Sequence, residues 1–105
     1  MTFGSDAPVE PPAPLFGLYA ALTRRDERGQ PPKGWYPEQC LTLREALQAY
    51  TYGAAFAGGI EDEIGKLERG KQADFVVLSD DPFSIPPEGI KEIRIRATFF
   101  GGDIP

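Results

Sequence analysis

The run from Ile64 to Leu78 constrains the fold of this chain more than any other segment, because it joins two glycine-marked turns to a strand without a polar face. The turns are marked by Gly65 and Gly70. Residues 73–78 then place apolar side chains on both faces of an extended chain, a pattern typical of a strand that is buried on both sides. The sequence therefore predicts a sheet that needs a layer of other residues on each face.

The composition limits the partners that this chain can have. Its 105 residues have the length of one domain, and its net charge is −5. The lysines and arginines are scattered among sixteen acidic residues, so the basic stripe of a nucleic-acid-binding protein is missing. We therefore expect neither nucleic acid nor an anionic membrane surface as a partner.

Cys40 is the single cysteine, and the chain contains no histidine. These residue types are the usual ligands of catalytic transition metals, so little is present to hold such an ion. As a nucleophile Cys40 would need a lysine or arginine as its basic partner, and we interpret it as a spacer before a helix. Because no export signal is recognisable and no internal disulfide can form, we expect the cytoplasm as location.

After a short strand end, local signals divide the chain into helices first and strands later. The predicted elements are a strand end at residues 2–3, a helix over 14–25, a helix over 43–56, a strand over 73–78, a helical turn at 86–88, and a strand over 93–100. Thr42 and Glu45 form a capping box at the start of the second helix, and Gly58-Gly59 ends it. Gly101-Gly102 predicts a hairpin turn with a short returning strand at 103–105.

Several polar and aromatic residues could contribute to a site. Asp6 follows the first strand on a glycine-flanked loop, where catalytic acids often lie, although such a residue is more often a loop or cap residue. Trp35 and Tyr36 either pin their loop to the surface or border a ligand. We interpret the acidic run 61–63 as solvated charge rather than a calcium site, and Asp80-Asp81 as a turn rather than an acid–base pair.

Four motifs together carry a resemblance to a known family. They are Phe3-Gly4-Ser5-Asp6-Ala7-Pro8-Val9, Leu41-Thr42-Leu43-x-Glu45-Ala46-Leu47-x-x-Tyr50-Thr51, Ile64-Gly65-x-Leu67-x-x-Gly70-Lys71-x-Ala73-Asp74-Phe75-Val76-Val77-Leu78, and Asp81-Pro82-Phe83. In this order they resemble the C-terminal portion of a metal-dependent amidohydrolase, within the subgroup called amidohydrolase family 3.

The resemblance implies an α/β or α+β fragment of a larger fold. Residues 1–57 would be the remnant of strand eight and the following helices of a (β/α)8 barrel. Residues 58–105 would be the C-terminal part of the associated β-sandwich. Asp6 would match the strand-eight aspartate, which binds or faces a divalent, zinc-like metal and shuttles a proton during hydrolysis of a carbon–nitrogen bond.

The histidines and the bridging residue that complete this metal centre in the family have no counterpart in the chain. We therefore expect a fragment of a hydrolase of non-peptide amides that is inactive alone and has no cofactor of its own. The alternatives are a stand-alone structural module that forms homo-oligomers, or a subunit of a split amidohydrolase. In each case the open sheet and helix faces would associate, with a second copy or with the missing barrel portion.

Overall fold

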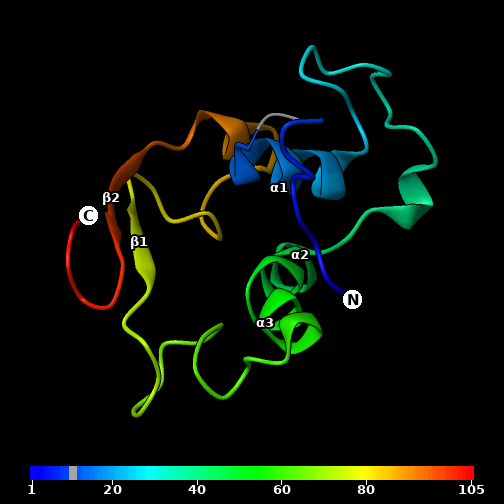
Figure 1. Cartoon of the computed structure of the whole chain (residues 1–105). Coiled ribbons are helices and arrows are strands. Elements are labelled where there is room, and N and C mark those ends of the chain that lie inside the picture. Colours follow the sequence, from blue (N-terminus) through cyan, green and yellow to red (C-terminus); the bar gives the residue numbers. More distant parts are fainter. Residues whose placement is uncertain (10–11) are drawn as a thin grey trace.

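The computed structural model describes residues 1–9 and 12–105 (Figure 1). This part of the chain forms a small α/β structure of short helices and two antiparallel strands. In chain order its elements are α1 (Pro14–Thr23), a 3₁₀ turn (Pro37–Gln39), α2 (Leu43–Tyr50), α3 (Tyr52–Gly58), β1 (Phe75–Leu78), a 3₁₀ helix (Pro87–Glu92) and β2 (Ile95–Phe99). Within the described ranges no helix has the length and apolar character needed to cross a bilayer.

The predicted first helix is confirmed as α1, although it ends at Thr23 and not at residue 25. Pro14 occupies its first position, and Arg24 caps its end in the left-handed conformation with φ of 51°. Leu18 and Tyr19 are buried on the side that faces the 3₁₀ helix Pro87–Glu92, which lies against α1 in Figure 1. The helical turn predicted at residues 86–88 is thus confirmed, and it supplies the partner that buries α1.

The capping box is confirmed, but the prediction of one helix over residues 43–56 is wrong. Thr42 accepts a hydrogen bond from the Glu45 N–H at 3.3 Å, and the Glu45 carboxylate accepts one from the Thr42 N–H at 2.8 Å. The helix then breaks at Thr51, whose φ and ψ are −110° and −90°. A Cβ atom at Gly65 would lie 2.8 Å from the Ala55 side chain and 3.3 Å from the Thr51 carbonyl oxygen. The loop around Gly65 therefore packs directly on the break, which separates α2 from α3.

The sheet differs from the prediction in burial. β1 and β2 pair antiparallel, with Phe75 opposite Phe99 and a register irregularity between Val77 and Leu78. Val76 and Val77 are 48% and 41% exposed, so the prediction of a strand buried on both faces is wrong for this chain. The reason is that the described residues place no second layer over the sheet, which projects away from the helices in Figure 1.

The second predicted strand, 93–100, is shorter in the structure. Ile93 is buried directly after the 3₁₀ helix and joins the core, whereas Ile95 in β2 is 50% exposed. The hairpin turn at Gly101-Gly102 is confirmed, with φ of 60° and 89°, but the returning segment makes only one bridge, between Phe100 and Asp103. Positive φ at both central positions is the geometry that favours glycine in such turns.

The strand end predicted at residues 2–3 is not a strand in the structure. The Phe3 N–H donates to the Ala49 carbonyl oxygen of α2 at 2.9 Å, so this extended segment hydrogen-bonds to the end of a helix rather than to a neighbouring strand. The core formed beneath it consists of Leu18, Ala46, Ile90 and Ile93. Leu18, Ala46 and Ile90 lie in helices, so the packed part of the molecule is mainly helical.

Candidate functional site

Asp6 lies in an exposed turn immediately after the extended segment 1–5. Its backbone is left-handed with φ of 52°, a conformation that aspartate tolerates better than most residues. The Asp6 carbonyl oxygen accepts a hydrogen bond from the Val9 N–H at 2.9 Å, which closes the turn. Asp6 is thus presented at the end of an extended segment, as expected for a residue at a strand end, although no strand is formed.

The segment before Asp6 is fixed to the helices by two contacts. Besides the hydrogen bond from Phe3 to Ala49, the Phe3 ring packs edge-on against Tyr50, with ring centroids 5.2 Å apart. At the start of the chain, the Met1 carbonyl oxygen lies so close to Gly53 that a Cβ atom there would overlap it. The close approach of this segment to α3 therefore requires glycine at position 53.

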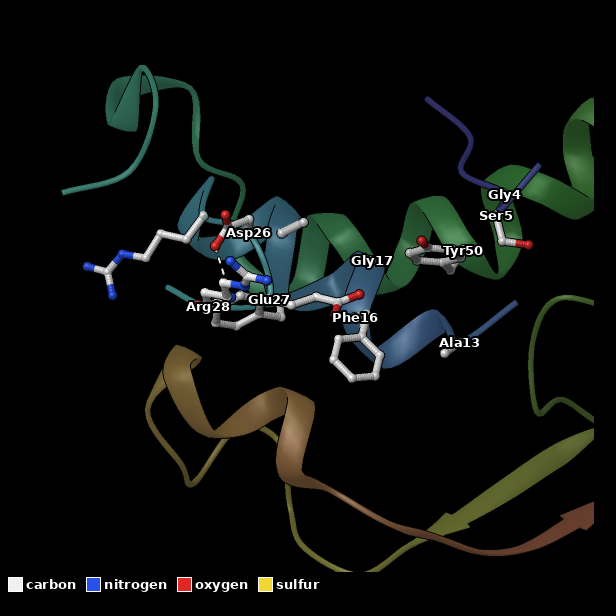
Figure 2. A pocket seen from close by; sticks show the side chains of 12 residues that line it. Gly4, Ser5, Ala13, Phe16, Gly17, Asp26, Glu27, Arg28 and Tyr50 are labelled. Carbon is white, nitrogen blue, oxygen red and sulfur yellow. Dashed lines mark hydrogen bonds between the residues drawn. The ribbon is translucent and has the colours of Figure 1, made fainter. Parts of the chain in front are cut away.

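A cavity of about 580 Å³ opens beside the residues that precede Asp6 (Figure 2). Its lining combines the N-terminal segment, α1, the loop after α1 and the end of α2, with the residues Gly4, Ser5, Ala13, Phe16, Gly17, Tyr19, Ala20, Arg25, Asp26, Glu27, Arg28 and Tyr50. Asp6 itself is not among them. The cavity therefore adjoins the segment that carries Asp6 without bringing its carboxylate into the lining.

The charged end of this cavity is already engaged in local interactions. The Asp26 carboxylate accepts hydrogen bonds from the Arg28 and Gln30 N–H groups, each at 2.9 Å. Arg25 lies 3.5 Å from the Glu88 carboxylate, while its Nε atom is buried without a hydrogen-bond partner. These interactions hold the loop after α1 in place. The charged side chains of the lining are two cationic ones, Arg25 and Arg28, and two anionic ones, Asp26 and Glu27.

The residues present do not fit the metal centre that the resemblance implies. Among residues 1–9 and 12–105, no three His, Cys, Asp or Glu side chains lie close enough together to hold a metal ion. Asp6 would be one ligand without imidazole neighbours, because the sequence contains no histidine. A tightly held catalytic zinc ion takes three protein ligands. We therefore assign no metal-dependent step to the residues of this chain.

The other acidic candidates have local structural roles. The Asp81 carboxylate accepts from the Phe83 N–H and the Ser84 hydroxyl, each at 2.9 Å, and Asp80 accepts from the Ser79 hydroxyl at 2.7 Å. The interpretation of this pair as a turn is confirmed. The run Glu61-Asp62-Glu63 forms no cluster with metal-ligand geometry in the described part of the chain.

Trp35 and Tyr36 pack on each other rather than into the core. Their rings meet edge-on at 4.9 Å, and the Arg24 guanidinium lies 5.1 Å from the centroid of the Trp35 ring. Both side chains stay more than half exposed, and neither lines one of the larger cavities. Their contacts secure the loop to the end of α1, which is the packing role rather than the ligand role.

The carboxyl group of Glu45 has a displaced pKa. The pKa of Glu45 lies below its ordinary value because the backbone N–H and the hydroxyl of Thr42 donate hydrogen bonds to the carboxylate. This shift belongs to the helix cap and lies outside the cavity. It indicates structural stabilisation of α2 rather than acid–base chemistry.

Comparison with known proteins places the chain in a family. The profile described as "Amidohydrolase family" matches residues 1–104. YtcJ of Bacillus subtilis, an amidohydrolase by name, is 40% identical over 101 residues, which is 96% of this chain and 19% of YtcJ. The N-substituted formamide deformylase of Arthrobacter pascens is 30% identical over 97% of this chain and 18% of its own length.

A plant relative extends the same pattern. Protein LONG AFTER FAR-RED 3 of Arabidopsis thaliana is 35% identical over 97% of this chain and 17% of its own length. No solved structure is significantly similar. The chain belongs to the amidohydrolase family, as the four motifs predicted, and it spans about a fifth of the length of these relatives.

The sequence-based interpretation missed the cavity and the glycines that shape its surroundings. Gly17 lies inside α1, and a Cβ atom there would overlap the Tyr50 hydroxyl. A glycine within a helical pattern costs about 1 kcal/mol relative to alanine, so an isolated one suggests a packing reason. The glycines at positions 17 and 53 could have indicated from the sequence that other parts of the chain approach these helices closely.

Proposed function

We propose that this chain is the C-terminal portion of a metal-dependent hydrolase of carbon–nitrogen bonds in non-peptide amides. The observation that carries the proposal is the family match over residues 1–104, combined with relatives of which the chain covers less than a fifth. Residues 1–57 then correspond to the last strand of a (β/α)8 barrel and the helices after it. Residues 58–105 correspond to the C-terminal part of a β-sandwich.

Asp6 is the residue of this chain that we assign to the catalytic centre. Support comes from its motif, its exposure and its place at the end of an extended segment. A carboxylate at such a position can accept and donate a proton during amide hydrolysis when substrate is held beside it. Among the described residues no group of His, Cys, Asp or Glu side chains could hold the metal ion beside it, so in our proposal the chain by itself is inactive.

The exposed apolar side chains of the sheet support the proposal that a partner covers it. Val76, Val77 and Ile95 leave apolar surface on β1 and β2 open. In our proposal the remaining barrel and sandwich residues cover this surface, whether on the same polypeptide or on a separate subunit. The same exposure favours the second candidate, a structural module that buries the surface in a homo-oligomer.

The experiment exchanges the matching segment of the formamide deformylase for this chain and measures formate release from an N-substituted formamide. We expect the folded chimera to hydrolyse the substrate, and Asp6→Asn to lower kcat by about a hundredfold or more, as for loss of a general acid–base group. Asp62→Asn, a matched change in the exposed acidic run, should leave kcat within about twofold. Equal activity of the Asp6→Asn and unsubstituted chimeras would refute the assignment.

The two candidates differ in the behaviour of the isolated chain. A homo-oligomeric module should sediment as a defined oligomer that Val76→Lys dissociates, because a buried lysine would be unpaired. The C-terminal portion of an enzyme should instead form a stoichiometric complex when co-expressed with the deformylase from which the matching segment has been removed. Recovery of a defined oligomer and no such complex would favour the module.

A further inference from the structure

Tyr50 touches the chain on both sides of Asp6. Its ring packs edge-on against Phe3, three residues before Asp6, with centroids 5.2 Å apart. Its hydroxyl lies directly over Gly17 in α1, eleven residues after Asp6, at a position where a Cβ atom would overlap it. One side chain at the end of α2 thus closes the loop that carries Asp6, and Figure 2 shows Tyr50 between the N-terminal segment and α1.

The backbone beside Tyr50 strengthens this closure. The neighbouring residue Ala49 accepts the hydrogen bond from the Phe3 N–H at 2.9 Å, so ring and backbone hold the same segment. Asp6 itself is exposed and hydrogen-bonds through its carbonyl oxygen to Val9. Its position relative to the helices therefore depends on the anchors before and after it.

We propose that Tyr50 is a positioning residue that sets the place of the Asp6 carboxylate by joining Phe3 to Gly17. The proposal rests on the proposed function, in which Asp6 acts in catalysis. A displacement of about 1 Å in a catalytic group can cost about a hundredfold in rate, so a contact that fixes its supporting segment matters to turnover. The tyrosine needs no contact with substrate for this role.

Gly17 gives a test that separates positioning from ordinary core packing. Alanine favours a helix over glycine, so Gly17→Ala should strengthen α1 itself. The new methyl group would displace the Tyr50 ring and loosen Phe3. In Gly17→Ala/Tyr50→Phe the overlapping oxygen is gone, and the nearest ring atom, Cζ, would lie 3.0 Å from the added Cβ atom, so the ring can return after a small shift.

The measurement is amide hydrogen exchange by NMR on the full chain, at Phe3 and Val9, with Ala46 as a reference in the buried part of α2. We expect Gly17→Ala to accelerate exchange at Phe3 and Val9 by roughly three- to tenfold, the change expected for loss of one aromatic pair, with Ala46 unchanged or slower. The double variant should return Phe3 and Val9 to the original rates. Uniform acceleration of all three amides, no change at Phe3, or no rescue would each overturn the proposal.

Turnover in the deformylase chimera links the contact to Asp6. We expect Gly17→Ala to lower kcat by about tenfold with KM within about threefold, and Tyr50→Phe added to it to restore kcat. If Asp6→Asn abolishes turnover while Gly17→Ala leaves kcat unchanged, the positioning role is wrong and the proposed function stands. If Asp6→Asn has no effect, the proposed function is wrong, and the exchange data still report whether Tyr50 closes the loop.

Discussion

The helical region and the sheet of this chain use similar apolar residues with opposite results. In the helical region α1, α2 and the 3₁₀ helix Pro87–Glu92 enclose Leu18, Ala46 and Ile90, and Ile90 is 0% exposed. In the sheet Val76 and Ile95 are 48% and 50% exposed. Apolar character alone does not produce a core, because a helix pair can bury its own stripe, whereas a two-stranded sheet needs another layer.

The largest expected effect lies at Ile90. Ile90→Ala should lower the free energy of unfolding by about 2–5 kcal/mol, because it removes a fully buried side chain and leaves a cavity. Ile95→Ala, the matched change in the sheet, should cost less than about 1 kcal/mol because that side chain is already half in water. Urea unfolding followed by circular dichroism measures both values, and equal losses would contradict the contrast between the regions.

A smaller effect is expected at the start of α2. Thr42→Ala should destabilise the chain by about 1 kcal/mol, because the Glu45 N–H loses the side-chain oxygen that caps it. Thr98→Ala provides a control threonine on the exposed face of β2. The melting temperature should fall for Thr42→Ala and change little for the control, and a reversal of this order would argue against the cap as a local determinant of stability.

Val77→Thr should change the stability of the isolated chain by no more than about 0.5 kcal/mol, because the side chain is 41% exposed. It should nevertheless weaken binding to any partner that covers the sheet, since a hydroxyl group would be buried there. Sedimentation of the co-expressed complex compares the variant with the unsubstituted chain. A large loss of stability without any loss of association would show that the sheet is packed within the chain.

The smallest effect is the pH dependence that comes from Glu45. Its pKa is lower in the folded chain than in the unfolded one, so the stabilisation is present above the unfolded pKa and is lost as the pH falls through the folded pKa. Glu45→Gln should therefore have a flatter unfolding profile in this acidic range, measured by melting temperature against pH.

Local chemistry made much of the helical region predictable. Pro14 and the Thr42–Glu45 box identify helix starts, because their effect depends on residues only a few positions away. The break at Thr51 was not predictable in this way, and the segment packed against it, around Gly65, lies fourteen residues later in the sequence. The strand of residues 73–78 was recognised. Its apolar pattern shows that its side chains favour burial, but it does not show whether other residues of the chain cover them.

The candidate site was predictable only in part. The motif around Asp6 indicated the residue and the family, and the family is confirmed. The catalytic role of Asp6 remains a proposal. Tyr50 contacts Phe3 and Gly17, which lie far from it in the sequence. These contacts could not be predicted from a local sequence pattern.

The place of Trp35 has a practical consequence for spectroscopy. It is the single tryptophan of the chain, it is 62% exposed, and its near neighbours are Tyr36 and Arg24 in the loop after α1. Its fluorescence should already resemble that of a solvated indole in the native state. A denaturation curve measured by tryptophan emission would therefore report the detachment of this loop. It would not report the unfolding of the core around Ile90.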